Sequence, residues 1–196
     1  MKADRHFPSK ELINLNHLNL DFVSEIEKTS GVNINKCYHC KSCAGGCHFY
    51  QTTDYPPNSV IRLVQLGLRN EALECSTIWL CVGCHTCSIQ CPMGIDMAGF
   101  MDGLRQIAIR EEVVIAEPDI LNFHRDVLHT IKRHGRTHKL EVMLRYKARK
   151  WDWFSDLAVG LKMFSKGKLH LMPSKIKAIG EIRKIFAPRP DGVIYE

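Results

Sequence analysis

The chain lacks any run of eighteen apolar residues, which is about the length that crosses the hydrocarbon core of a bilayer. Its first residues, Met1 to Glu11, are polar and contain none of the apolar stretch of an export signal. We therefore expect no membrane span and a cytoplasmic protein. A glycine-rich phosphate loop is also missing, so the sequence gives no support to nucleotide binding.

Charge is unevenly distributed along the chain. Residues 1–111 hold 10 basic (Lys, Arg) and 11 acidic residues, whereas residues 112–196 hold 17 and 10. The densest basic stretch, residues 132–150, has no zinc-finger spacing and no interleaved aromatic module of the kind that binds nucleic acid. Its apolar residues Leu140, Met143 and Leu144 have the spacing of a buried helical stripe. We expect a solvated or partner-facing helix and no nucleic-acid partner.

Nine cysteines are the main chemical feature of the sequence. Thiols in the cytoplasm stay reduced, and an odd number cannot pair completely within one chain, so metal is a better use for them than disulfides. Eight of them fall in two runs with the same spacing, C-x2-C-x2-C-x3-C. The first run consists of Cys37, Cys40, Cys43 and Cys47, and the second of Cys81, Cys84, Cys87 and Cys91, followed by Pro92.

The spacing within each run is typical of cubane 4Fe-4S clusters. Three cysteines separated by two residues each can present three thiolates to three irons, and the fourth iron takes a thiolate from elsewhere. In two-cluster ferredoxins the last cysteine of each run binds the other cluster. This arrangement predicts one cluster bound by Cys37, Cys40, Cys43 and Cys91, and another bound by Cys81, Cys84, Cys87 and Cys47.

Two other cofactors fit the cysteines less well than the clusters do. Zinc closes with four ligands, whereas two triple runs with a fourth cysteine each supply eight ligands at iron-sulfur spacing. The pattern Cys81-Val-Gly-Cys84-His85 also matches c-type haem attachment, but it leaves Cys87 and Cys91 unexplained and no export signal accompanies it. We therefore predict two 4Fe-4S clusters rather than zinc or haem.

Four further residues near the runs are expected to have structural roles. Four thiolates complete each cubane, so His39, His48 and His85 are expected at the surface or beside the ligands rather than among them. Cys75 lies outside both runs and is interpreted as a buried packing thiol, with a redox switch as the sharper alternative.

The periodic segments have the helical period, so we predict a nearly all-α fold. One helix should end at Gly31, and another should run from Pro118 to Gly135. The expected helix starts or caps are Asp21, Asn58 or Ser59, Asp96, Pro118, Thr137 and Pro173 with Ser174.

Two such cysteine runs with a helical spacer resemble the α-helical ferredoxin domain. The segments 60–68 (VIRLVQLGL) and 78–87 (IWLCVGCHTC), through Cys91-Pro92, are closely similar to the heterodisulfide reductase C subunit over about residues 20–111. Succinate dehydrogenase subunits would add a 2Fe-2S domain, and no cysteine precedes Cys37. The resemblance implies an N-terminal segment (1–30), an α-helical ferredoxin dicluster domain (31–111), and a basic helical C-terminal extension for subunit docking (112–196).

The resemblance also implies a function. B-type subunits of these reductases carry adjacent Cys-Cys pairs at their catalytic clusters, and no two cysteines are adjacent here. The chain would then be a non-catalytic electron-relay subunit of a hetero-oligomer, placed between a flavin-containing A-type subunit and a catalytic B-type subunit. Open alternatives are an independent dicluster ferredoxin shuttle, the relay of a related sulfur-oxidising or other anaerobic complex, and a metal-stabilised interaction module.

Overall fold

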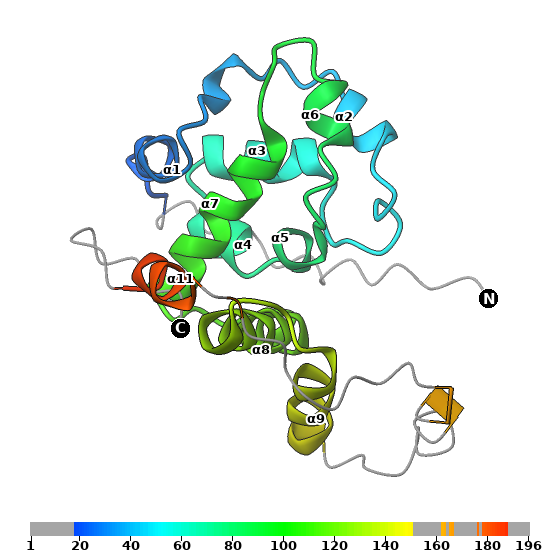
Figure 1. The fold of residues 1–196 in the computed structure, drawn as a ribbon. Coiled ribbons are helices and arrows are strands. Elements are labelled where there is room, and N and C mark those ends of the chain that lie inside the picture. The colour runs from blue at the N-terminus through cyan, green and yellow to red at the C-terminus, as the bar shows by residue number, and fades with distance from the viewer. Residues whose placement is uncertain (1–17, 151–161, 164, 167–175, 177, 188–196) are drawn as a thin grey trace. The chain divides into compact units, whose positions relative to one another are not determined.

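The computed structural model describes residues 18–150, 162–163, 165–166, 176 and 178–187, and it divides the chain into two compact units (Figure 1). Unit 1 is Met1–Glu117 and unit 2 is Pro118–Glu196. Every regular element among the described residues is a helix, which confirms the predicted all-α fold. No helix in this part of the chain is long and apolar enough to cross a membrane.

Unit 1 is built around one long helix, α7, which contacts four other helices of the unit (Figure 1). Its side chains Phe100, Leu104 and Ile107 are fully buried, at the three- and four-residue spacing expected for an inner face. The elements of unit 1 are α1 (Phe22–Ser30), η2 (Ile34–Lys36), α2 (Ser42–Gly45), α3 (Pro57–Gln65), α4 (Arg69–Leu73), α5 (Ser76–Leu80), α6 (Thr86–Ile89) and α7 (Met97–Arg110).

Two helix ends in unit 1 match their prediction. Gly31 ends α1 with φ of 70°, and its N–H donates to the carbonyl oxygen of Glu27. Asp96 begins α7 by accepting hydrogen bonds at Oδ1 from the N–H groups of Ala98 (3.1 Å) and Gly99 (3.2 Å). Both ends use side chains or conformations that satisfy free helix-terminal groups, which is why the residue type signalled them.

Two other predicted caps of unit 1 are wrong. The Asp21 carboxylate makes no capping bond, because its backbone is already helical, and the Asp21 N–H donates to Oδ1 of Asn19 instead. Helix α3 begins at Pro57, so Asn58 and Ser59 lie inside its first turn. Proline suits that first position because it lacks only an N–H that would have no helical partner.

Helices α1, α4 and α7 are joined through Arg69. Its guanidinium pairs with Glu25 of α1 and with Glu111, which follows α7, and it lies 4.6 Å above the ring centre of Phe22. Close packing adds to this junction: a Cβ atom at Gly103 would lie 2.8 Å from Cβ of Ser30. Helices α1 and α7 therefore approach each other at a glycine and are held by partly buried charge.

Unit 2 contains α8 (Pro118–His134), α9 (Lys139–Lys150) and α11 (Ile179–Ile185), with α8 packed against the other two. Helix α8 has its predicted bounds and is followed by Gly135 with φ of 76°. The predicted Thr137 cap is wrong: the ring nitrogen Nδ1 of His138 accepts the Glu141 N–H at 3.2 Å, one residue further along. The predicted start at residues 173–174 lies outside the described residues, and Ile176 precedes α11.

The basic stretch on α9 is exposed as expected, but its inner face differs from the prediction. Met143 and Leu144 are 39% and 48% exposed, whereas Val142 is 6% exposed. A shift of one residue turns a helix by about 100°, so the apolar spacing identified a face beside the buried one. Glu141 accepts ion pairs from Arg145 and His134, which places the one acid of the stretch among its cations.

Candidate cofactor-binding site

The two cysteine runs fold into the same local structure. A short helix ends just before the first cysteine of each run, η2 before Cys37 and α5 before Cys81, and both cysteines have extended backbone. Four residues later, Lys41 (φ 64°) and His85 (φ 58°) take the left-handed conformation and lead into α2 and α6. The runs are therefore structural repeats as well as sequence repeats.

Left-handed backbone is concentrated in these runs. Among the described residues, positive φ in a residue other than glycine occurs at His39, Lys41, His85 and Glu112. Each such residue costs free energy, about 1 kcal/mol or more, and persists only where its surroundings impose it. Three of the four flank cysteines, which indicates that the loops are shaped to aim sulfur atoms rather than to relax.

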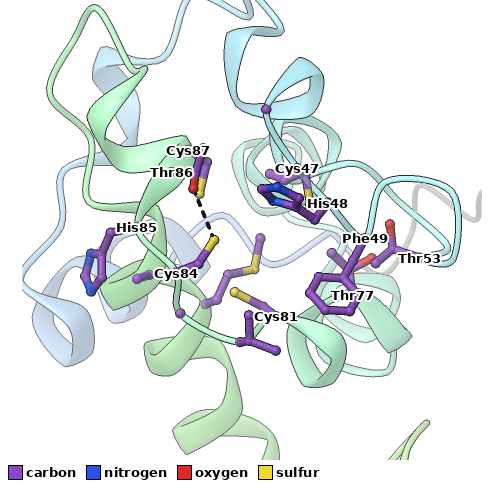
Figure 2. Close-up of a pocket in the computed structure, with 16 residues that line it drawn as sticks. Cys47, His48, Phe49, Thr53, Thr77, Cys81, Cys84, His85, Thr86 and Cys87 are labelled. Carbon is purple, nitrogen blue, oxygen red and sulfur yellow. Dashed lines mark hydrogen bonds between the residues drawn. The ribbon is translucent and has the colours of Figure 1, made fainter.

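Hydroxyl groups lie beside the second cysteine of each run. Sγ of Cys40 is 3.3 Å from Oγ of Ser42, and Sγ of Cys84 is 3.4 Å from Oγ1 of Thr86 (Figure 2). Hydrogen bonds from these hydroxyls, and then from the backbone N–H groups of the same residues, lower the pKa of both thiols. Both positions thus favour the thiolate, the form that binds metal.

The third cysteine of each run lies in a drier environment. Burial raises the pKa of the Cys43 thiol, and it raises the pKa of the Cys87 thiol to about 11, with the Cys81 charge adding to the effect. A thiolate at these positions needs a cationic partner in place of water. Iron supplies that charge when it binds.

Helices α2 and α6 pack together and bring the two runs side by side. A Cβ atom at Gly46 would lie 2.0 Å from Oε1 of Gln90, so this approach depends on glycine. Two separate cavities lie at the runs. The first is lined by Cys37, Cys40, Cys43 and Cys91, and the second by Cys81, Cys84, Cys87 and Cys47 (Figure 2).

The lining of each cavity suits a buried cluster. Ile61, Ile95 and Met97 line the first cavity, and Phe49, Ala98 and Met101 are among the residues that line the second. Apolar walls of this kind keep water from a cluster and so influence its reduction potential.

A buried polar atom in the first cavity lacks a partner. Asn58 lines the cavity, is 8% exposed, and its Oδ1 has no hydrogen-bond partner in the described part of the chain. Amide oxygen and nitrogen can exchange places by a rotation of the side chain, so this group can present an N–H donor to sulfur. The donor set and this amide both fit a 4Fe-4S cluster.

The remaining cysteine and the histidines have other positions. Cys75 lines neither cavity; its Sγ lies 3.3 Å from the Ala72 carbonyl oxygen, and burial raises its pKa to about 11. It is a buried thiol, as predicted. His39 bonds Gln65, His85 is exposed and lies 3.7 Å from Asp96, and His48 is exposed at the edge of the second cavity.

All nine cysteines are free thiols. No group of three or more His, Cys, Asp or Glu side chains within the described ranges is arranged to hold a single metal ion. A cubane places each thiolate on a different iron, so its four sulfur ligands surround a volume rather than a point. The two cavities have that form.

Two residues outside any sequence motif hold the runs in place. Arg105 on α7 donates from Nε to the Ile78 carbonyl oxygen and from Nη2 to the Cys81 carbonyl oxygen. Gln65 on α3 donates from Nε2 to the Ile34 carbonyl oxygen at 3.0 Å. Local sequence patterns could not identify them, since each reaches its run from a helix more than twenty residues away in sequence.

Comparison with known proteins supports the cofactor. Residues 33–95 match the family model of the 4Fe-4S dicluster domain. The chain is similar to the iron-sulfur C subunit of the CoB–CoM heterodisulfide reductase of Methanopyrus kandleri, at 29% identity over 53% of this chain and 58% of the relative. It is also similar to the corresponding iron-sulfur protein of Methanocaldococcus jannaschii, numbered 2 among its C subunits, at 32% identity over 51% and 58%.

A third relative is the C subunit of the H2:CoB-CoM heterodisulfide,ferredoxin reductase of Methanothermobacter marburgensis, at 28% identity over 42% of this chain and 45% of the relative. The chain thus spans about half the length of the curated relatives it matches. These findings confirm the predicted resemblance to the heterodisulfide reductase C subunit and the predicted cofactors, two 4Fe-4S clusters.

Proposed function

We propose that the chain relays single electrons between a flavin-containing A-type subunit and a catalytic B-type subunit of a cytoplasmic heterodisulfide-reductase-like complex. The observation that carries this proposal is the pair of four-cysteine cavities within a 4Fe-4S dicluster domain. The chain has no adjacent cysteine pair and no catalytic residue of its own in this proposal. Its relatives are named as subunits of an oxidoreductase, which supports a place in a larger complex.

The proposed ligands follow the interleaved pattern. Cys37, Cys40, Cys43 and Cys91 hold one cluster, called cluster A below, and Cys81, Cys84, Cys87 and Cys47 hold the other, cluster B. Each 4Fe-4S cluster supplies a centre that takes up and releases one electron. The protein fixes the thiolates, excludes water with the apolar cavity walls, and offers hydroxyl and amide donors that stabilise negative charge on sulfur.

Both clusters have a route to the surface. Cys40 and Cys84, the second cysteines of the two runs, are exposed, while the third cysteines are more enclosed. The exposed side chains Tyr38, Val82 and Ile89 lie next to the runs and offer apolar contact area for a partner. We propose that electrons enter and leave at these two places, and that the basic region 112–196 contributes to docking.

Cysteine substitutions test the ligand assignment. The interleaved arrangement predicts that Cys91→Ser affects the same EPR signal as Cys40→Ser, and that Cys47→Ser affects the same signal as Cys84→Ser. About four of about eight irons should be lost in a variant whose cluster fails to assemble. Cys75→Ser is the matched control, because this cysteine lines neither cavity, and it should keep all the iron.

The opposite pairing would refute the interleaving: Cys91→Ser would then alter the signal that Cys84→Ser alters. Iron near zero in the unmodified protein would instead favour the interaction module. Anaerobic purification from the source cells tests the relay role. We expect co-purification with a flavoprotein and a protein rich in Cys-Cys pairs, whereas a monomer that is competent alone would support the ferredoxin shuttle.

A further inference from the structure

The two cysteine runs are held at equivalent points by groups of different charge. Ile34 and Ile78 each lie three residues before the first cysteine of a run, and the carbonyl oxygen of each accepts a side-chain hydrogen bond from a distant helix. At Ile34 the donor is the neutral amide of Gln65. At Ile78 it is the guanidinium of Arg105, which also binds the carbonyl oxygen of Cys81.

Arginine keeps its charge at every pH that the protein tolerates. The Arg105 guanidinium is partly buried and bonded directly to the backbone of a proposed cluster ligand, so water screens it less than it screens a free surface charge. Gln65 donates at the equivalent place without net charge, and its Oε1 lies 2.9 Å from Nε2 of His39.

We propose that Arg105 makes cluster B more easily reduced than cluster A. Reduction adds one negative charge to a cluster, and a fixed positive charge nearby stabilises the reduced form. A unit charge roughly 10 Å away at an effective dielectric constant of about 20 changes a one-electron equilibrium by about tenfold or slightly more. This inference rests on the proposed ligand assignment.

Other charges near the runs are less effective. Lys36 and Lys41 flank the first run and are exposed, so water screens them. Beside the second run, His85 and Asp96 are more than half exposed and oppose each other in sign when the imidazole is protonated. Asp54 is bonded to α5, the helix that leads into the second run.

Asp54 accepts the N–H of Ser76 at 2.7 Å, at the end of α5 away from Cys81. Its carboxylate therefore lies further along the chain from the cysteine than Arg105 does. The consequence of the Arg105 charge is a preferred direction within the chain: an electron delivered to cluster A passes to cluster B and tends to stay there.

Redox titration of the cluster-loaded protein, followed by EPR under anaerobic conditions, tests the inference. Arg105→Gln introduces the amide that the first run already has. It should lower the ratio of reduced to oxidised cluster B about tenfold at fixed solution potential, which corresponds to about 59 mV for one electron, and leave cluster A within about twofold. Arg105→Lys keeps the charge and should stay close to the unmodified potentials.

Lys28→Gln is the charge control, because it removes one positive charge from an exposed site on α1. If Arg105→Gln holds its iron but shifts neither potential, or shifts both equally, the inference fails while the ligand assignment stands. If Arg105→Gln does not assemble, the unmodified protein decides. The signal altered by Cys84→Ser must then have the higher potential, and the reverse order overturns the inference.

Discussion

Removal of the Arg69 side-chain charge should destabilise unit 1 strongly. Arg69 is 16% exposed at its side chain and pairs with Glu25 and Glu111, whose side chains are 31% and 33% exposed. Arg69→Met keeps the apolar stem over Phe22 but leaves two carboxylates without their shared cation. Breaking a fully buried pair costs about 3–5 kcal/mol and a surface pair about 0–1 kcal/mol, so we expect about 2–4 kcal/mol here.

Anaerobic thermal unfolding of the cluster-loaded protein, followed by far-UV circular dichroism, measures this cost. A loss of 1 kcal/mol lowers Tm by about 2–4 °C in a chain of this size, so Arg69→Met should melt roughly 10 °C lower. Arg62→Met on α3 is the control, because Arg62 is exposed, and it should change Tm by no more than about 2 °C.

The pH dependence gives a second check. The hydrogen bond from Arg69 holds the pKa of Glu25 below its usual value of 4.5. A depressed carboxyl pKa contributes stability that is present above the unfolded-state value and lost as pH falls through the folded-state value. The difference between the two proteins should therefore be the same at pH 7 and pH 5. A difference that vanishes by pH 5, or Tm values that agree at pH 7, would refute this account.

Two further changes have clear expectations. Gly103→Ala should lower the stability of the cluster-loaded protein by about 1–2 kcal/mol in the same melting assay, since its Cβ would lie 2.8 Å from Ser30, whereas Gly180→Ala on α11 meets nothing within 4 Å and should cost nothing. An unchanged Tm for Gly103→Ala would show that α1 can move aside. Cys75 should resist alkylation by iodoacetamide at pH 8 in the folded protein and react after denaturation, as mass spectrometry can measure, because burial raises its pKa to about 11. Rapid reaction in the folded state would support the redox-switch interpretation.

Local signals in the sequence were reliable where one residue acts through its own backbone or side chain. Gly31 and Asp96 end and begin helices as predicted, since a left-handed C-terminal position and an N-terminal carboxylate are decided within a few residues. Asp21 and Thr137 have suitable side chains at nearly suitable places, but neighbouring groups, Asn19 and His138, make the bonds instead. Residue type alone cannot choose between adjacent candidates.

The spacing of the cysteines determined the cofactor, because a C-x2-C-x2-C loop can present three thiolates to a cubane regardless of the rest of the chain. The all-α fold followed from the period of the apolar residues. Tertiary structure decided what surrounds each group of cysteines. Arg105 and Gln65 reach the runs from α7 and α3 and place a cation at one and a neutral amide at the other. Such contacts depend on how the helices pack, and no local pattern in the sequence encodes them.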